Sequence, residues 1–371
     1  MSDNSVNRLA RLRQRMSETG TDLVAVGPSS HMQWLLGLNP HGDERPVMAL
    51  VTIDNAGVLM PKLNAEAARA QCGSIPFYEW SDADGPQVAL TTLLNKLDIN
   101  RPGLNVVIDE MMRADFAFFL LDQFEAPVRQ FTQDTVGILR AEKDAEEHQL
   151  LRECARLNDT AFELAFASLR TGMSENDVKT ILVDHYRAHG AEPEFCIVGF
   201  GANSAFPHHH TGTDVLQPEM AVLIDSGCRL NGYPSDMTRC AWYGDRPDPK
   251  FTQTAGIVET ALQAALTVVK PGMACCEVDE AARGVIEAAG LGAAFPHRTG
   301  HGLGVDVHEP PYITASNNQR LTVGNVFSIE PGIYLTDSFG IRLEDIVYLG
   351  PTGPQILSDL SRSVLQITPR Y

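Results

Sequence analysis

Residues 221–239, AVLIDSGCRLNGYPSDMTR, place two carboxylates at the ends of predicted strands. Asp225 follows four consecutive apolar residues, and Asp236 comes eleven residues later, a spacing that suits a hairpin with both acids at neighbouring strand positions. Burying an unpaired charge is costly, and two adjacent carboxylates repel each other unless a cation lies between them. Each acid taken singly also has an explanation without a cation. Asp225 could be a turn residue or helix cap, and Asp236 could form an ion pair with Arg239.

Three later segments also carry metal-ligand side chains in strand-like or turn-like surroundings. They are residues 297–309, HRTGHGLGVDVHE, residues 327–334, FSIEPGIY, and residues 340–347, GIRLEDIV. His301 and His308 are seven residues apart, so they cannot share one face of an extended strand and must lie across a turn or serve different roles. Each histidine of the first segment has a buried structural role as its alternative. Because Pro310 follows His308-Glu309, the chain lacks an H-E-x-x-H helix, which excludes ordinary zincin chemistry.

Four carboxylates and one imidazole thus form a candidate ligand set for metal ions. Its members are Asp225, Asp236, His301, Glu330 and Glu344. Such a set favours hard or borderline divalent ions such as Mn, Co, Fe or Zn. Four acids exceed what a single catalytic metal with an open position needs, so the sequence predicts two divalent metal ions, and among the candidates we favour manganese.

The length of the chain and its pattern of apolar segments predict two domains. A chain of 371 residues exceeds the size at which one hydrophobic core usually stops growing. Short apolar segments at 23–26, 47–51, 57–60 and 104–108 lie between helical stretches, an α/β pattern. After Lys143 a long helix is predicted, with an apolar stripe formed by Leu150, Cys154, Leu157, Ala161 and Leu164. We place the boundary just before this helix, giving domains 1–135 and 136–371.

The second domain contains an internal repeat with an offset of one hundred residues. Residues 159–165, DTAFELA, resemble residues 259–265, ETALQAA, and Gly172 and Gly190 recur as Gly272 and Gly290. Glycine suits a helix C-terminus because it tolerates the left-handed conformation found there. Each half then reaches a Pro-His pair, Pro207-His208 or Pro296-His297. Although chance similarity between helices is the alternative, the ordered matches favour two duplicated halves that face each other across a cleft.

Charge, cysteine content and hydropathy exclude several classes of protein. The net charge of −18, from 47 acidic and 29 basic residues, argues against binding to nucleic acid. Seven cysteines without a C-x-x-C pair disfavour a disulfide framework and a thiolate zinc site. The first residues lack an apolar segment of signal-peptide length, and no stretch approaches about 18 uninterrupted apolar residues. We therefore expect a cytoplasmic protein without a membrane partner.

The acidic and histidine segments together resemble the pita-bread metallopeptidases, and among them the proline-specific branch of Xaa-Pro dipeptidases (prolidases) and aminopeptidase P. The motifs that carry the resemblance are Ile224-Asp-Ser-Gly, Gly232-Tyr-Pro-Ser-Asp-Met-Thr-Arg239, Gly300-His-Gly-Leu-Gly with His308-Glu309, Ile329-Glu-Pro-Gly-Ile-Tyr334 and Arg342-Leu-Glu-Asp345. The resemblance is strong over residues 136–371, and the first third is similar to the creatinase-type domain of the same branch. It implies an α/β (α+β) protein with a creatinase-like N-terminal domain, a C-terminal pita-bread fold with pseudo-two-fold duplicated halves, and a homodimer.

The resemblance also implies roles for individual residues. All five candidate ligands are present, with Asp236 and Glu344 bridging two metal ions, which separates this chain from creatinase itself. His208 and His308 are implied to flank the substrate, and Arg342 is assigned a catalytic role with them. His209 and His210 follow His208 directly, and we choose His208 because it comes directly after Pro207. Glu330 is expected to pass a proton from the nucleophile to the leaving nitrogen.

Two cysteines near the ligand motifs have two interpretations. Cys228 and Cys240 lie close in sequence to Asp225 and Asp236, and Cys240 stands where the family more often has threonine. Oxidation of these thiols would then affect activity. The alternative is that both are small buried apolar residues, and we favour it.

The predicted function is metal-dependent hydrolysis of Xaa-Pro bonds in small peptides. The alternatives are an Xaa-Pro aminopeptidase, or a hydrolase of the same fold acting on a non-peptide amide or amidine such as a compatible solute. The N-terminal domain would decide the substrate, and residues Trp34, His41 and Arg45 in the loop-like stretch 30–45 are candidates to reach a partner's cleft, with simple surface exposure as their alternative. A non-catalytic binding protein on this scaffold predicts lost ligands, which the complete set disfavours.

Overall fold

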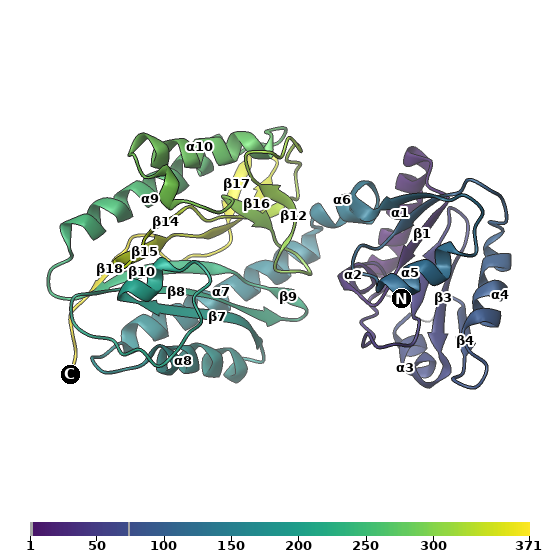
Figure 1. Cartoon of the computed structure of the whole chain (residues 1–371), viewed down its shortest axis with the longest axis horizontal. Helices are drawn as coiled ribbons and strands as arrows, with labels where there is room; N and C mark the ends of the chain where they lie inside the picture. Colours follow the sequence, from purple (N-terminus) through teal and green to yellow (C-terminus); the bar gives the residue numbers. More distant parts are fainter. Residues whose placement is uncertain (1–2, 73–74) are drawn as a thin grey trace. The chain divides into compact units, whose positions relative to one another are not determined.

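The computed structural model describes residues 3–72 and 75–371, and its contacts divide the chain into two compact units. The units are Met1–Arg140 and Ala141–Tyr371 (Figure 1). The boundary expected from sequence, between residues 135 and 136, coincides with the start of helix α6 (Val136–Ala141). The assignment of domains stays a prediction.

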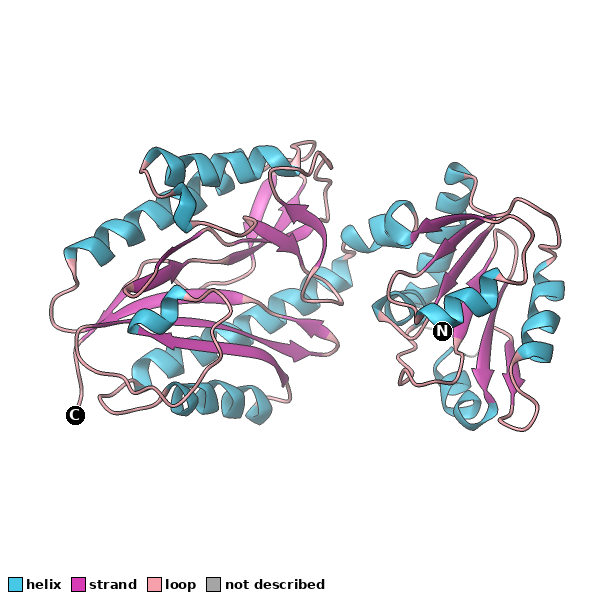
Figure 2. Cartoon of the chain, in the orientation of Figure 1, coloured by secondary structure: helices cyan, strands magenta, loops and turns pink. Residues whose placement is uncertain are grey.

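The N-terminal unit is an α/β sandwich whose sheet contains the four strands predicted from sequence. Among its described residues, six strands form one sheet in the order β4-β3-β2-β1-β5-β6. Figure 2 shows the strands of this unit in magenta and its helices in cyan. The strands are β1 (Leu23–Val26), β2 (Met48–Val51), β3 (Ala56–Pro61), β4 (Phe77–Trp80), β5 (Asn105–Ile108) and β6 (Val128–Phe131). The helices are α1 (Asp3–Thr19), α2 (Ser30–Leu36), α3 (Lys62–Cys72), α4 (Gln87–Leu97) and α5 (Ala114–Leu121). Leucines of α4 pack with apolar residues of β1, β2, β3 and β5 into one core, which fixes the register of the sheet.

The stretch predicted to be loop-like, residues 30–45, begins as helix α2. Ser29 caps this helix by accepting a hydrogen bond from the backbone N–H of His31. Trp34 lies within the helix and is only 1% exposed, so its predicted surface position is wrong. The indole is buried because the helix turns this residue inward, which an isolated aromatic residue in the sequence does not reveal. His41 is exposed, Arg45 pairs with Asp82, and their contact with a partner stays a prediction.

The C-terminal unit places its strands between two pairs of helices (Figure 1). The first half contains α7 (Ala145–Ser168), α8 (Glu175–Ala188), β7 (Glu192–Phe200), β8 (Met220–Leu230), β9 (Tyr233–Pro234) and β10 (Met237–Tyr243). The second contains α9 (Pro249–Val268), α10 (Cys275–Ala288), β11 (Gly300–Gly302), β12 (Glu309–Ile313), β13 (Val326–Ile329), β14 (Gly332–Leu335), β15 (Phe339–Arg342), β16 (Asp345–Gly350) and β17 (Gly353–Ile356), followed by β18 (Leu365–Ile367). Residues 141–371, all of them described, form one sheet in the order β18-β10-β8-β7 with β9 beside β8, a second in the order β12-β11-β13-β16-β17, and the pair β14-β15.

The internal repeat predicted from sequence is a repeat of structure. Helices α7 and α8 pack on the first sheet as one core, and α9 and α10 pack on the second sheet as another. Gly172 and Gly272 precede the second helix of each pair with φ of 87° and 88°, and Gly190 and Gly290 end it with φ of 76° and 75°. The matched backbone angles confirm the duplicated halves.

The apolar stripe predicted for α7 is displaced from the face that the helix actually buries. Cys154 and Ala161 are buried, but Leu164 is 44% exposed, so its predicted core position is wrong. The helix instead turns Asn158 inward, where its side-chain amide donates to Ser226 O at 2.9 Å and its carbonyl oxygen accepts from Tyr186 OH at 2.6 Å. A buried but fully bonded polar residue has no apolar signature, so periodicity alone misplaces the face.

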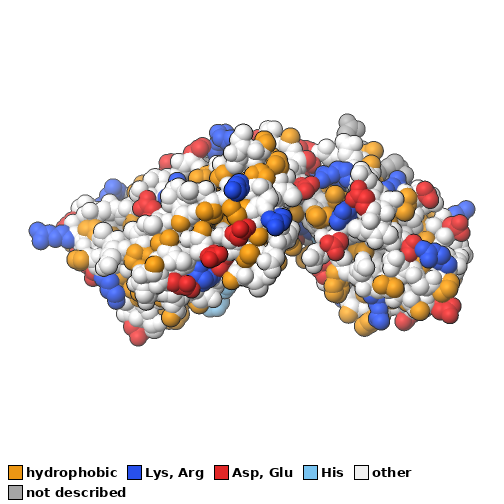
Figure 3. All heavy atoms as spheres, turned by 90° about the horizontal axis from the view of Figure 1, so that it is seen from above, with side chains coloured by type: hydrophobic (Ala, Val, Ile, Leu, Met, Phe, Trp, Pro, Cys, Tyr) orange, Lys and Arg blue, Asp and Glu red, His pale blue; other side chains and the backbone are white. Residues whose placement is uncertain are grey.

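The surface of the chain mixes charged and apolar side chains. On the face drawn in Figure 3, acidic, basic and hydrophobic side chains are interspersed over both units. No helix in the described part of the chain combines the length and the apolar character needed to cross a lipid bilayer.

A pair of glycine substitutions tests the duplicated helix ends. Gly290 has φ of 75°, and a methyl group added there would meet no atom within 4 Å, so Gly290→Ala should cost roughly 1–2 kcal/mol of unfolding free energy through backbone strain alone. Gly284 lies inside α10 with the same open surroundings, so Gly284→Ala should stabilise the protein by up to about 1 kcal/mol. Urea unfolding of both variants measures this difference, and an equal effect of the two would contradict the assigned conformation.

Candidate metal centre

The hairpin at residues 221–239 places one carboxylate on a strand and the other at the start of the strand paired with it. Strand β8 pairs with β10 in a register that sets Asp225 opposite Thr238, and Asp236 comes directly before β10. Gly227 makes this close approach possible, because a side chain there would collide with the Ser235 carbonyl. The alternative partner of Asp236, Arg239, instead contacts Asp345 Oδ1 at 2.7 Å, so that alternative is wrong.

The second half of the unit supplies the other three side chains. His301 lies on β11, Glu330 directly follows β13, and Glu344 lies between β15 and β16. The backbone N–H of Glu330 donates to Thr299 O at 2.7 Å, and the backbone N–H of Glu344 donates to Thr238 O at 3.2 Å. The second of these bonds joins the two halves directly beneath the acidic side chains.

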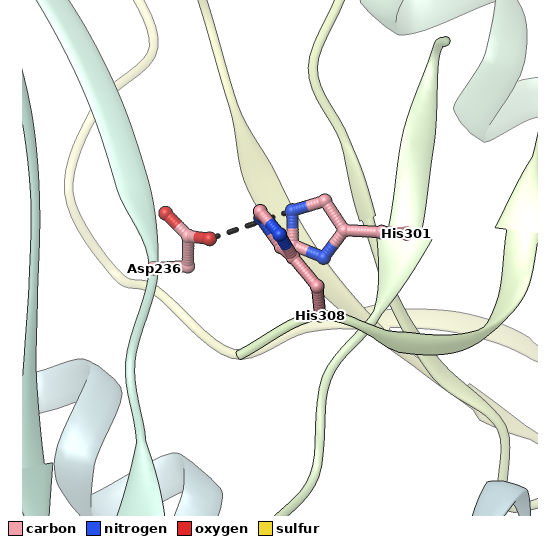
Figure 4. A group of neighbouring side chains, drawn as sticks. All are labelled: Asp236, His301 and His308. Atoms are coloured by element: carbon pink, nitrogen blue, oxygen red, sulfur yellow. Dashed lines mark ion pairs between the residues drawn. The ribbon is translucent and has the colours of Figure 1, made fainter. Parts of the chain in front are cut away.

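The five predicted ligands lie together in one cavity of about 740 Å³. Ligand atoms of Asp225, Asp236 and Glu344 lie within 4.8 Å of one another, and so do those of His301, Glu330 and Glu344. A third group combines Asp236, His301 and His308 (Figure 4). His301 Nε2 lies 3.5 Å from Asp236 Oδ2 and 3.6 Å from Glu330 Oε1. Side chains spread over 120 residues of sequence therefore converge on one small volume.

Two oxygen atoms in this cluster are well suited to a cation. Asp225 Oδ1 and Glu344 Oε1 are buried, and neither has a hydrogen-bond partner in residues 3–72 and 75–371. Buried polar atoms are almost always paired, because an unpaired one loses its hydration without compensation. Divalent ions bound between these carboxylates would supply the missing interactions, and oxygen ligands of this kind suit such ions. The residues present therefore fit a metal centre.

Burial controls the protonation of these groups when no cation neutralises them. Burial, followed by neighbouring carboxylates, raises the pKa of Asp236 and of Glu344 well above the ordinary range. Burial likewise raises the pKa of Glu330 to about 7 and lowers the pKa of His301 to about 3. His301 is therefore a neutral imidazole; its Nδ1 donates to Gly302 O at 3.1 Å, which leaves the Nε2 lone pair directed at the acids.

The other predicted site residues border the same cavity. His208 lines it, whereas His209 Nε2 lies 2.7 Å from Glu175 Oε2, so the imidazole after Pro207 faces the site. His308 stacks edge-on against His301 with ring centroids 4.1 Å apart (Figure 4). Cys228 and Cys240 are both buried, as the packing interpretation predicts.

Arg342 is also in the cavity wall, and its guanidinium is fully engaged by protein groups. It donates to Asp225 Oδ2 at 2.6 Å, to Tyr334 OH at 2.7 Å and to Thr238 Oγ1 at 2.9 Å. Thr238 Oγ1 in turn donates to Glu344 Oε2 at 2.8 Å. Arg342 and Thr238 therefore hold two of the candidate ligands in a fixed orientation.

Several residues at the site escape sequence reasoning. His297 and Arg298 line the cavity, and Tyr334 contacts His297. None of the three is among the site residues expected from sequence. His297 Nε2 lies 2.8 Å from Tyr334 OH, and burial lowers the pKa of His297 to about 4. A signal for His297 exists, because Pro296-His297 repeats Pro207-His208 in the other half. Arg298 lies in the histidine segment and Tyr334 ends the motif Ile329–Tyr334, but no feature of the sequence assigns either residue to the site.

A second group of candidate ligands lies in the N-terminal unit, and its side chains are already paired. His31, Asp109 and Glu110 lie within 4.8 Å of one another. Arg140 Nη1 is 3.0 Å from His31 Nδ1, and Thr132 Oγ1 donates to Glu110 at 2.8 Å. An arginine inside the group supplies the positive charge that a cation would otherwise provide, so this is a structural network.

Comparison with known proteins agrees with this geometry. The model of metallopeptidase family M24 matches residues 149–351, and that of the creatinase/prolidase N-terminal domain matches residues 8–151. The chain belongs to metallopeptidase family M24. This M24 metallopeptidase therefore has the predicted fold class, a creatinase-type N-terminal domain followed by a pita-bread catalytic domain, and family membership implies a divalent metal.

Individual relatives match this M24 metallopeptidase over almost its whole length. An Xaa-Pro dipeptidase of Lactobacillus delbrueckii is 30% identical, over 97% of this chain and 99% of its own. The crystal structure of dipeptidase PepE from Mycobacterium ulcerans is similar with a TM-score of 0.92 at 30% identity, covering 98% of each chain. A prolidase from Thermococcus sibiricus is similar with a TM-score of 0.90 at 30% identity, covering 99% of this chain and 100% of its own.

Removing the metal should make stability depend on pH in a defined direction. In the metal-free protein the raised pKa of Glu330, about 7, means that the folded state holds more protons than the unfolded state between its ordinary pKa and neutrality. Below about pH 6.5 the lowered pKa values of His301 and His297 act in the opposite direction, because these histidines are neutral in the folded state and protonated in the unfolded state. The stability of the metal-free protein should therefore fall as pH rises from about 6.5 to about 8, where the buried acids of the site still lose protons. Thermal unfolding with a chelator and with saturating manganese measures this. Manganese should raise Tm most at the upper end of the pH range. If Tm depended on pH equally with chelator and with manganese, the assignment of a metal site to these acids would be contradicted.

Proposed function

We propose that this M24 metallopeptidase is an Xaa-Pro dipeptidase that uses two divalent ions. The proposed metal ligands are Asp225, Asp236, His301, Glu330 and Glu344. The observation that carries the proposal is the pair of unpartnered, buried carboxylate oxygens on Asp225 and Glu344. Asp236 and Glu344 are the carboxylates that belong to more than one of the ligand groups in the cavity, which supports their role as bridging ligands.

The remaining groups of the site divide the chemical work among them. A bound metal pair would activate water as the nucleophile and polarise the scissile carbonyl. Glu330 is suited to transfer a proton during the reaction. Its side chain is 15% exposed, more than that of Asp225, Asp236 or Glu344, and it lines the cavity. It would accept a proton from water and deliver it to the proline nitrogen, which must be protonated to leave. His208 and His308, on the cavity wall, would stabilise the negative charge on the carbonyl oxygen.

Arg342 fits a positioning role better than direct contact with substrate. Its guanidinium already donates to Asp225, Tyr334 and Thr238, which leaves little capacity for a further partner. We therefore assign it to holding the Asp225 carboxylate toward the metal site.

A second arginine in the cavity, Arg298, supports a substrate with a free carboxylate. Arg298 lines the cavity and stacks on the Tyr312 ring at 4.7 Å. Within the described residues its guanidinium makes no hydrogen bond or ion pair with the protein. In a dipeptide the terminal carboxylate is attached to the residue that leaves, so it lies near the scissile bond and within the same cavity. An arginine there favours dipeptides over longer peptides and over uncharged amides.

A substrate panel tests the proposed function. The stripped protein, reloaded with manganese or cobalt, should release proline from Xaa-Pro dipeptides with higher kcat/KM than from Xaa-Pro-Yaa tripeptides. Absence of proline release from every dipeptide would refute the proposal. Cleavage of tripeptides alone would indicate an aminopeptidase, and cleavage of a non-peptide amide alone would indicate the small-molecule alternative.

The same panel includes an internal control for the carboxylate contact. Arg298→Gln should raise KM for Xaa-Pro dipeptides by about 10-fold, because a charge-assisted hydrogen bond from this half-buried arginine contributes roughly 1.4 kcal/mol. KM for the corresponding Xaa-Pro amides, which lack the carboxylate, should be unchanged. An equal rise in KM for the dipeptides and for their amides would show that Arg298 does not bind the substrate carboxylate.

A further inference from the structure

His308 occupies the cavity wall with little to hold its side chain. Its imidazole is exposed and makes no hydrogen bond in the described part of the chain. Its one ring contact there is the edge-on packing against His301 (Figure 4). The orientation of the His308 ring therefore depends on where the backbone of residue 308 is placed.

The next residue, Glu309, is anchored in the interior by an ion pair. Glu309 Oε1 lies 2.5 Å from Lys143 Nζ, and the two side chains are 5% and 0% exposed. Lys143 comes from the segment just before helix α7, and 166 residues separate the partners. Glu309 also begins β12, where it pairs with Gly302, the residue after His301. A buried, charge-assisted contact thus fixes the strand end that carries His308.

The loop between the two histidines is shaped around this ion pair. A side chain at Gly304 would lie 2.8 Å from Lys143 Cε and closer still to Glu309 Oε1. Arg229 holds the same loop from its other side by donating to Val305 O at 2.7 Å. The glycine leaves the space that the lysine and glutamate fill.

We propose that the Lys143–Glu309 ion pair is a positioning element for His308, fixing the loop so that this imidazole meets the substrate. Breaking one partner leaves an uncompensated buried charge, which must be hydrated by moving the loop. The inference rests on the proposed function, since it assumes that His308 contacts the substrate. The competing explanation is a purely structural pair, because the Lys143 backbone N–H also bonds Gly324 O at 2.8 Å and ties down the start of the catalytic unit.

A double-mutant cycle in the metal-loaded enzyme separates the two explanations. Lys143→Met keeps the length of the side chain and removes its charge. In the wild-type background it should lower kcat for an Xaa-Pro dipeptide by about 30-fold with KM changed less than about 3-fold, since misplacing a reacting group by about 1 Å costs up to about 100-fold. In the His308→Ala background the same substitution should change kcat by less than about 2-fold, because the group it positions is gone. Equal losses in both backgrounds, or no loss in the wild type, would overturn the proposal.

Further variants guard against loss of folding. Glu309→Gln preserves the shape of the side chain and one acceptor for Lys143. Gly304→Ala crowds the ion pair without removing a charge. Both should lower kcat in the wild-type background and change it little in the His308→Ala background. Arg156→Met is the matched control, because Arg156 lies in α7, is 56% exposed and pairs with Asp359 away from the loop. It should leave kcat and KM unchanged, and metal content should be the same in every variant.

A measurement without substrate distinguishes failure of this inference from failure of the proposed function. In the zinc-loaded protein labelled at histidine Cε1, the NMR signal of His308 should be single in the wild type and in Arg156→Met. In Lys143→Met and Glu309→Gln it should shift or broaden, because the ring leaves its contact with His301. An unchanged signal in both would overturn the proposal even if dipeptides are cleaved. A changed signal in a protein that cleaves no dipeptide would sustain the positioning and reject only the function.

Discussion

Repulsion among buried carboxylates governs the catalytic unit. Asp225, Asp236, Glu330 and Glu344 converge in one cavity, and Arg342 neutralises only part of their charge. Two like charges about 4 Å apart repel by roughly 4 kcal/mol at the effective dielectric of a protein surface. Such a cluster persists in a folded protein either protonated or bound to cations. The raised pKa values of Asp236, Glu330 and Glu344 show that the metal-free cluster holds protons. The unpartnered oxygens of Asp225 and Glu344 are available to bind cations instead.

The duplicated architecture explains how one chain gathers so many acids. The first half contributes Asp225 and Asp236 from a hairpin, and the second contributes His301, Glu330 and Glu344 from strand ends. Helices α7 and α8 cover one core, and α9 and α10 cover a second core that also contains Ala221, Leu223, Cys240 and Trp242 of the first half. Apolar packing therefore holds the halves together, and the site between them does not have to provide stability. The bonds that cross between the halves, from Thr238 to Glu344 and from Arg342 to Asp225, set the spacing of the ligands.

Sequence alone predicts the parts of this structure that leave local signals. Four of the candidate ligands are identifiable because each interrupts an apolar or glycine-rich segment, and Asp236 is identifiable from its spacing to Asp225. The duplicated halves are identifiable because glycines recur at a fixed offset. His208 and its two-fold counterpart His297 follow prolines in both halves, yet only His208 is expected at the site from sequence. Family comparison then confirms the fold class, while the assignment of individual ligands remains a proposal.

The features that sequence reasoning misses depend on partners far away in the chain. Lys143 and Glu309 carry no mark of their pairing, because the contact forms only once α7 and β12 are in place. The predicted surface position of Trp34 is wrong because the stretch expected to be a loop begins as a helix, capped by Ser29, that buries the indole. In α7 the error arises from Asn158, a polar residue whose burial is stabilised by Ser226 and Tyr186 rather than by hydrophobicity.

The most direct test of the metal centre is anomalous X-ray diffraction from crystals of the manganese-loaded protein. A dinuclear centre at this place requires two manganese peaks in the cavity, with oxygens of Asp236 and Glu344 coordinating both ions and His301 Nε2 bound to one of them. In Glu344→Gln crystals at least one peak should be lost. Peaks elsewhere, or a fully ordered cluster of five side chains with no manganese between them, would contradict it.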